Sequence, residues 1–323
     1  MVAERAALYV ADPINLTASF TYPATSLVSY LFQRVPGQFY EWQCLAGLDI
    51  LFLACIAPAA AMPRKNWAGA VLVFAAGFLL PFFFSVVPAG TPSTIYANAM
   101  ADTPLALLFG GTLCLYAAAG GRKTGFFACA MPLAVLTMTK DIGFAYALIV
   151  TFLIGLDQLF GTPHPDTKPA RIFGVSLAKC SILAAVVLAV FISWNRYTAA
   201  VTPTETTGAS VGSAGLSYGA VLTGGIKQLL GIGREERFAQ IMQSMGQAFL
   251  YRRVCLLGAP IMAVSCILLL FTAAFVAAPA GAARRRTVVG FVGGAFCFAA
   301  LYLFHLILYF YNSPRPKIRL EGL

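Results

Sequence analysis

Charged residues are scarce in this chain: Asp, Glu, Lys and Arg together make up 11% of its 323 residues. An ordinary soluble domain carries about 25%, so the composition excludes that class of protein. Intrinsic disorder is excluded as well, because 59% of the residues are hydrophobic and 26 are Phe, which supplies far more burial than a polar tract can. We therefore expect an integral membrane protein whose first partner is the lipid bilayer.

Histidine and paired cysteines are lacking too. The chain has 2 His, and none of its 8 Cys belongs to a Cys-x-x-Cys pair, so the sequence predicts neither a structural zinc site nor a disulfide framework. It contains no cofactor motif, and a divalent metal stays open. The net charge of +10 would favour nucleic-acid binding in a soluble protein, but its basic residues lie in short clusters between apolar runs, as topology signals do. We expect no nucleic-acid partner.

The apolar runs have the length of membrane spans. A helix needs about 20 apolar residues to cross about 30 Å of hydrocarbon. The candidate runs cover residues 42–62, 67–88, 103–119, 125–139, 142–160, 173–194, 254–279 and 287–311. The run 125–139 is short, and only Lys140-Asp141 separates it from 142–160. The two runs therefore form either one interrupted helix, which gives seven spans, or two separate spans, which gives eight.

The distribution of basic residues favours eight spans. The basic clusters are Arg64-Lys65, Arg122-Lys123, Lys168 with Arg171, and Arg284-Arg285-Arg286. If 125–139 and 142–160 cross separately, all four clusters fall on one face, as the positive-inside tendency favours. The predicted fold class is an all-α polytopic membrane protein with about eight transmembrane helices. Both termini and Lys140-Asp141 are then predicted on the outer face.

The predicted spans divide the chain into five parts. These are an outer-face N-terminal segment (1–41), a transmembrane core of about six spans (42–194), an outer loop (195–253), two C-terminal spans (254–311) and a polar tail (312–323). In the outer loop, apolar residues recur at helical spacing, which predicts an amphipathic helix in the outer interface. They are Phe238, Ile241, Met242, Met245 and Phe249. The inner loops are short, so function is expected outside or within the membrane.

Two ionisable positions on the predicted outer face are candidate site residues. Lys140-Asp141 is either a self-neutralising pair at a turn or a place where Lys140 binds an anionic group such as a lipid phosphate. Asp102 precedes Thr103-Pro104, which is typical of the start of a helix, where a carboxylate caps the first turn. A capping residue can also belong to an active site.

Three motifs follow one another on the predicted outer face. They are Tyr22-Pro23-Ala24 with the stretch to Glu41, the stretch from Tyr96 to Asp102 that opens a span, and the stretch from Leu136 to Gly143 around Lys140. Together they resemble motifs of the GT-C superfamily of glycosyltransferases that use polyprenyl-phosphate sugars, such as the protein mannosyltransferases and the aminoarabinose transferase. That family has a further helix and a catalytic acid upstream of the Tyr-Pro motif, so the resemblance implies an N-terminally truncated relative.

The resemblance implies a reaction and a set of site residues. The reaction is the transfer of a sugar from a lipid-linked sugar phosphate to a lipid, glycan or protein acceptor on the outer face of a bacterial plasma membrane. Asp102 is then the catalytic candidate. The substrate-binding candidates are Lys140, Tyr96, Asp141, Tyr22, Arg196, Arg252 and Arg253.

Two other functions stay open. In a transporter or flippase, Asp49, Lys140-Asp141 and the proline-bearing spans would form a pathway through broken helices. The absence of an evident internal repeat and the concentration of polar segments on one face argue against this alternative. The third possibility is a non-catalytic membrane assembly subunit, which the missing upstream carboxylate favours.

Cysteine labelling tests the predicted topology. In a chain whose native cysteines are replaced, Asn98→Cys, Asp141→Cys and Glu205→Cys should react with a membrane-impermeant maleimide added outside intact cells. His164→Cys should not react, because it lies on an inner loop beside a basic cluster. Labelling at position 164, or none at position 141, would contradict the eight-span arrangement.

Overall fold

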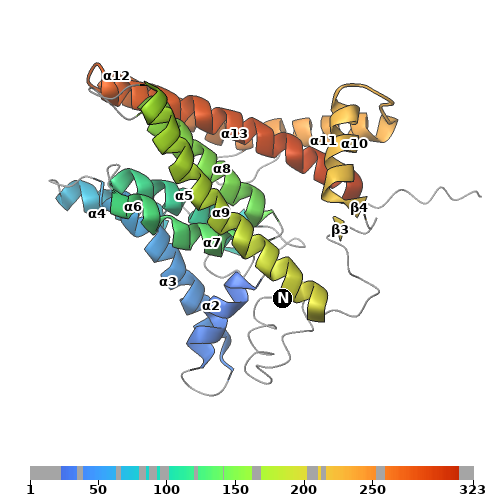
Figure 1. Cartoon of the computed structure of the whole chain (residues 1–323), viewed down its shortest axis with the longest axis horizontal. Coiled ribbons are helices and arrows are strands. Elements are labelled where there is room, and N and C mark those ends of the chain that lie inside the picture. The colour runs from blue at the N-terminus through green and yellow to red at the C-terminus, as the bar shows by residue number, and fades with distance from the viewer. Residues whose placement is uncertain are drawn as a thin grey trace, which may run out of the picture.

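The computed structural model of the chain describes residues 23–34, 39–62, 67–79, 85–86, 93–94, 102–119, 123–140, 142–161, 169–201, 210–211, 216–251 and 259–312. Its helices are α2 (Ala24–Gln33), α3 (Glu41–Ala60), α4 (Trp67–Leu79), α5 (Asp102–Ala118), α6 (Lys123–Ala128), α7 (Ala130–Thr137), α8 (Gly143–Leu156), the π-helical turn η4 (Asp157–Gly161), α9 (Pro169–Val201), α10 (Tyr218–Leu229), α11 (Glu236–Tyr251), α12 (Pro260–Ala277) and α13 (Ala282–Asn312) (Figure 1).

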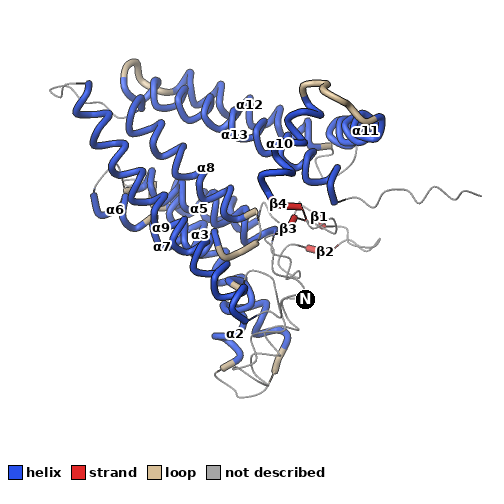
Figure 2. Tube along the Cα trace, turned by 45° about the vertical axis from the view of Figure 1, so that its right-hand side comes forward, coloured by secondary structure: helices blue, strands red, loops and turns tan. Residues whose placement is uncertain are grey.

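Helices dominate the described part of the chain, as the all-α prediction requires. The other regular elements in these ranges are four strands of two residues each. Strand β1 (Ser85–Val86) pairs with β2 (Ser93–Thr94), and β3 (Ser210–Val211) pairs with β4 (Leu216–Ser217), both antiparallel. Figure 2 shows these short strands beside the helical body, where they form no layer of their own.

Five helices are long and apolar enough to cross a membrane, so the chain is an integral membrane protein. They cover Glu41–Ala60, Gly143–Gly161, Ala170–Tyr197, Pro260–Ala277 and Ala283–Tyr311. Three shorter apolar helices cover Trp67–Leu79, Asp102–Ala118 and Gly125–Thr137. All eight coincide with predicted runs. The shorter ones reach less far, because a helix rises only about 1.5 Å per residue.

The chain breaks between the runs 125–139 and 142–160. Helix α7 ends at Thr137, α8 begins at Gly143, and the two helices pack against each other. At Gly143 a side chain would collide with the carbonyl oxygen of Leu136, so glycine is required where the backbone approaches this closely. The structure therefore excludes one continuous helix over 125–160.

The core lies where α5, α7, α8 and α9 meet. Leu133 and Leu136 of α7, Val150 of α8 and Leu183 of α9 are fully buried there. Lipid tails are as apolar as leucine, so in a bilayer such a core is held by close packing more than by the exclusion of water. Figure 1 shows α9 crossing over α8 and the α6–α7 segment.

Helix α3 packs against α5 at a glycine. A Cβ atom at Gly111 would lie 2.8 Å from the carbonyl oxygen of Cys55 and 3.1 Å from its Cα atom. Small residues at such contacts let two membrane helices approach closely enough to gain dispersion energy. The α3–α5 contact therefore depends on the missing side chain at position 111.

The amphipathic helix predicted in the outer loop is present as α11. Its residues Phe238 and Ile241 are buried against Leu306 and Phe310 of α13, and the rings of Phe238 and Phe310 meet edge to face at 5.4 Å. Met242, which the spacing placed on the same face, is 42% exposed instead. The hairpin of α10 and α11 thus sits on the C-terminal end of α13 (Figures 1 and 2).

The glycines of α13 differ from the pattern that the sequence suggests. Gly290 and Gly294 form a G-x-x-x-G motif, which is typical of close helix packing. A Cβ atom at either position would meet no atom within 4 Å, whereas one at Gly293 would lie 2.9 Å from Leu153 of α8. The contact between α13 and α8 therefore uses the glycine inside the motif.

A pair of neighbouring glycines tests the α3–α5 contact. Gly111→Leu should lower the stability of the purified protein in detergent by about 1–3 kcal/mol, because the new side chain overpacks the contact with Cys55. Gly110→Leu gains the same helix propensity and should not destabilise the protein, because a Cβ atom there meets nothing within 4 Å. Equal thermal unfolding temperatures for the two variants would refute the role given to Gly111.

Candidate active site

The structure brings the two principal candidate residues together. Asp102 is the first residue of α5, and Lys140 lies in the turn between α7 and α8. The ammonium Nζ of Lys140 lies 2.5 Å from Oδ1 of Asp102. Their side chains are 42% and 65% exposed, respectively. An exposed ion pair contributes only about 0–1 kcal/mol to stability. A ligand can therefore separate the two charges at little cost in free energy.

The turn that holds Lys140 is fixed by its own hydrogen bonds. The hydroxyl of Thr139 is buried and donates to the carbonyl oxygen of Val135 at 2.8 Å. The backbone N–H of Gly143 donates to the carbonyl oxygen of Lys140, also at 2.8 Å. The backbone of Lys140 is therefore held in place while its side chain projects from the protein.

The Tyr-Pro motif reaches the same turn. The backbone N–H of Ala24, the first residue of α2, donates to the carbonyl oxygen of Met138 at 2.9 Å. Met138 is two residues before Lys140. Parts of all three motifs, from positions 23–24, 102 and 138–140, thus meet at one end of the helical bundle.

The first turn of α8, which follows the Lys140 turn, carries two aromatic side chains. Tyr146 lies within electrostatic range of Asp102, and its ring meets Phe109 of α5 edge to face at 5.5 Å. Phe144, in the first turn of α8, stacks on Phe191 of α9 at 4.2 Å. The first turn of α8, close in sequence to Lys140, thus carries aromatic side chains that pack against α5 and α9.

Of the remaining candidates, the structure describes only Arg196. Arg196 is exposed on the last part of α9. Five others lie outside the described residues: Tyr22, Tyr96, Asp141, Arg252 and Arg253. Among the described residues, no group of three or more His, Cys, Asp or Glu side chains is arranged to hold a metal ion.

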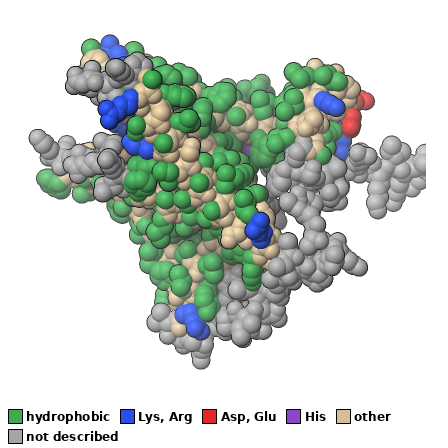
Figure 3. Space-filling view, in the orientation of Figure 1, with side chains coloured by type: hydrophobic (Ala, Val, Ile, Leu, Met, Phe, Trp, Pro, Cys, Tyr) green, Lys and Arg blue, Asp and Glu red, His purple; other side chains and the backbone are tan. Residues whose placement is uncertain are grey.

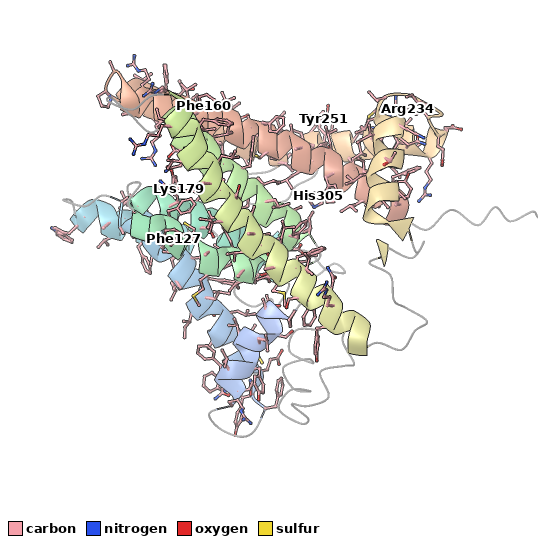
Figure 4. All side chains as sticks on the ribbon, viewed as in Figure 1. Phe127, Phe160, Lys179, Arg234, Tyr251 and His305 are labelled. Atoms are coloured by element: carbon pink, nitrogen blue, oxygen red, sulfur yellow. The ribbon has the colours of Figure 1, made fainter. Side chains whose placement is uncertain are left out.

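A second polar cluster, which the sequence did not reveal, surrounds Asp157 in η4. Arg286 of α13 binds both carboxylate oxygens of Asp157, with Nε to Oδ1 at 2.8 Å and the second nitrogen to Oδ2 at 2.9 Å. The hydroxyl of Tyr116 in α5 donates to Oδ2 at 2.8 Å and accepts from Gln158 at 2.6 Å. Lys179 of α9, labelled in Figure 4, donates to Gln158 at 3.2 Å.

This Asp157 network ties four parts of the fold together. Asp157 is 15% exposed, so its charge is largely removed from solvent, and two charge-assisted bonds from one planar guanidinium offset that cost. Asp157 and Arg286 are 129 residues apart in sequence, and no spacing rule pairs residues at that distance. The detectable signals were an acidic residue at the end of a span and the run of three arginines.

The two clusters lie at opposite ends of α8. Lys140 is three residues before the first residue of α8, and Asp157 follows its last one. Between the clusters, a cavity of about 360 Å³ opens between α8 and α9, with Phe152, Gly155 and Ser176 in its wall. Its lining is mostly apolar, so it can take a hydrocarbon chain.

Comparisons with known proteins add no relative. No protein-family model matches the chain, and no curated protein or solved structure is significantly similar to it. The chemistry of the molecule therefore has to be argued from its own residues. The Asp102–Lys140 pair is the strongest candidate for a ligand site, because it holds two exposed opposite charges at the turn that Ala24 also contacts.

Charge removal at the two clusters should have different effects on stability. Asp157→Asn leaves Arg286 without its counter-ion and weakens the hydrogen bond of Tyr116, and because Arg286 is 39% exposed the loss should be about 1–3 kcal/mol. Asp102→Asn is the matched control, and its loss should stay within about 1 kcal/mol because that pair is exposed. Thermal unfolding of the purified variants in detergent measures both. Similar losses would show that the Asp157 network is not what joins α13 to the core.

Proposed function

We propose that the chain is a membrane glycosyltransferase with a GT-C-like arrangement of about eight crossings. It transfers a sugar from a polyprenyl-phosphate donor to an acceptor hydroxyl on the outer face of a bacterial plasma membrane. The observation that supports this proposal best is the meeting of Pro23-Ala24, the described part of the Tyr-Pro motif, with Asp102 and Lys140 at one end of the bundle.

The distribution of charge supports the outer position of the site. Lys and Arg side chains gather at the upper left of Figure 3, in the region where Figure 1 places the junction of α12 and α13 and the start of α9. Arg286, one of the residues of that junction, belongs to the end of α8 that lies away from Lys140. If the basic end faces the cytoplasm, the Asp102–Lys140 pair faces outward.

The pair has the chemistry that the reaction requires. The acceptor hydroxyl attacks C1 of the donor sugar, and the bond between C1 and the phosphate oxygen breaks with inversion. The carboxylate of Asp102 takes the hydroxyl proton as general base, and the ammonium of Lys140 stabilises the negative charge of the departing polyprenyl phosphate. Opening the exposed ion pair to admit the substrates costs only about 0–1 kcal/mol.

The other candidates complete the proposed site as substrate contacts. A second anionic group on the donor or acceptor would need further cations, and arginine binds phosphate through several donors at once. The proposed contacts are Tyr22, Tyr96, Asp141, Arg196, Arg252 and Arg253. Tyr22 and Tyr96 suit a sugar or a prenyl chain, because the faces of a tyrosine ring are apolar.

Transport is the second candidate, and the Asp157 network favours it. Ionisable residues inside membrane proteins often mark substrate or ion pathways. Here hydrogen bonds link Lys179 of α9 to Gln158, Gln158 to Tyr116, and Tyr116 to Asp157 at the end of α8. A transporter should lose its function when this cluster is neutralised, whereas a transferase should lose it at Asp102 and Lys140.

Substitutions at the pair test the transferase proposal. Asp102→Asn and Lys140→Ala should each lower transfer by roughly 100-fold or more, because a general base alone contributes about 10²–10⁴ in rate. Lys140→Arg keeps the charge and should retain part of the activity. Glu236→Gln and Lys227→Ala remove exposed charges from α11 and α10 and should leave the rate unchanged. Release of polyprenyl phosphate from a panel of polyprenyl-phosphate hexoses and pentoses, in proteoliposomes, measures the rate.

Two results would overturn this proposal. Full activity of both Asp102→Asn and Lys140→Ala would remove the pair from the chemistry. Cleavage of no donor by the unaltered chain would instead favour a transporter or an assembly subunit. Flux that is lost in a folded Asp157→Asn variant, with an unfolding temperature close to that of the unaltered chain, but kept in Asp102→Asn would identify the transporter.

A further inference from the structure

Helix α2 exposes its apolar side and buries its polar side. Ser26, Ser29 and Gln33 recur at i, i+3 and i+7, which places them on one face, and all three are fully buried. Leu27 and Leu31 lie on the opposite face and are 42% and 64% exposed. A helix at a protein surface in water has the reverse arrangement, with its apolar stripe toward the core.

The buried polar side is held by α3. The hydroxyl of Ser29 donates to the carbonyl oxygen of Cys44 at 3.5 Å. The amide nitrogen of Gln33 donates to Sγ of Cys44 at 3.1 Å and to the carbonyl oxygen of Tyr40, and its amide oxygen accepts from the N–H of Tyr40 at 2.9 Å. Ser29 and Gln33 thus have protein partners and need no water, whereas the buried hydroxyl of Ser26 has no partner among the described residues. These polar groups of α2 all point away from its outer side, which can therefore face a purely apolar medium.

Helix α11 provides the contrast within the same chain. It is also strongly amphipathic, but it buries Phe238 and Ile241 and exposes Gln240 and Gln243, together with Leu250 and Tyr251 at its C-terminal end. That is the arrangement of a helix whose outer side meets water. The two helices therefore face different surroundings, even though both pack on the ends of longer apolar helices.

The residues next to α2 have the chemistry of a membrane boundary. Phe39, Tyr40 and Trp42, at the start of α3, are 39%, 41% and 64% exposed. Arg34 follows the last residue of α2 and lies over the ring of Tyr30 at 5.7 Å. Tyr and Trp concentrate at the level of lipid headgroups, where arginine can also reach phosphates while its stem stays apolar. The exposed leucines then lie at the depth of acyl chains.

We infer that α2 is embedded in the lipid leaflet on the Lys140 side of the membrane, with Leu27 and Leu31 in contact with acyl chains. The hydrogen bond from the N–H of Ala24 to the carbonyl oxygen of Met138 places this lipid contact next to the Lys140 turn. If the proposed function holds, the ion pair then stands at the edge of the hydrocarbon, within reach of a substrate whose tail stays in the bilayer. The embedding of α2 itself does not depend on the transfer reaction.

Tryptophan fluorescence can locate the exposed face of α2. In a chain with Trp42, Trp67 and Trp194 replaced by Phe, the variants Leu27→Trp, Leu31→Trp and the control Gln243→Trp are reconstituted in phosphatidylcholine vesicles. A helix embedded about 5–10 Å into the acyl boundary brings its side chains to brominated acyl chains. Leu27→Trp and Leu31→Trp should therefore lose most of their emission to brominated lipid and little to acrylamide, and Gln243→Trp should show the opposite.

Two outcomes would overturn the inference. Quenching of Leu27→Trp and Leu31→Trp by acrylamide to the level of Gln243→Trp would place α2 in water. Protection from both quenchers would mean that protein covers the leucines, from a second copy or another segment of the chain. If a Trp variant fails to fold, Leu27→Cys and Leu31→Cys take its place in a chain whose native cysteines are replaced. Labelling of these cysteines by an impermeant maleimide as fast as that of Gln243→Cys would refute the inference equally. None of these readouts uses transfer activity, so they succeed or fail separately from the proposed function.

Discussion

Hydrocarbon cannot solvate a charge or an unpaired polar group, and the described part of the chain is organised around that constraint. Asp157 lies at the end of an apolar helix and accepts hydrogen bonds from Arg286 and Tyr116. Gln158 donates in turn to the hydroxyl of Tyr116. That network fixes where α13 meets the core. It also leaves the opposite end of α8 as the place where an exposed pair of charges, Asp102 and Lys140, can serve a ligand instead of the fold.

The two pairs differ in the way that structural and functional charges usually differ. The guanidinium of Arg286 donates two hydrogen bonds to the carboxylate of Asp157, which is largely buried. Loss of either partner therefore lowers the stability of the fold. Lys140 makes one short contact to Asp102 at the surface, with a turn behind it that is already satisfied by backbone and Thr139 bonds. The fold therefore keeps its form while this pair opens, which is a requirement for any site that must exchange one anionic partner for another.

The sequence allowed local features to be predicted, and it failed where distant segments meet. Apolar runs placed the helices, the distribution of basic clusters favoured a break at Lys140-Asp141, and the spacing from Phe238 onward predicted α11. The ion pair of Asp157 with Arg286 was beyond reach, because 129 residues separate its partners. The choice of Gly293 over Gly290 and Gly294 depends on which face of α13 meets α8. The inverted polarity of α2 depends on its hydrogen bonds to α3, which no periodicity reveals.

Helix α13 joins the two ends of the protein mechanically. Near its start, Arg286 is bound to Asp157, and near its end, Phe310 is packed against Phe238 of α11. Its 31 residues form a rod of about 46 Å. A rotation of α13 about its axis would therefore strain the Arg286–Asp157 hydrogen bonds and, at the same time, move Phe310 against Phe238 of α11. Helix α13 thus couples the Asp157 network near its start to the position of α11 near its end.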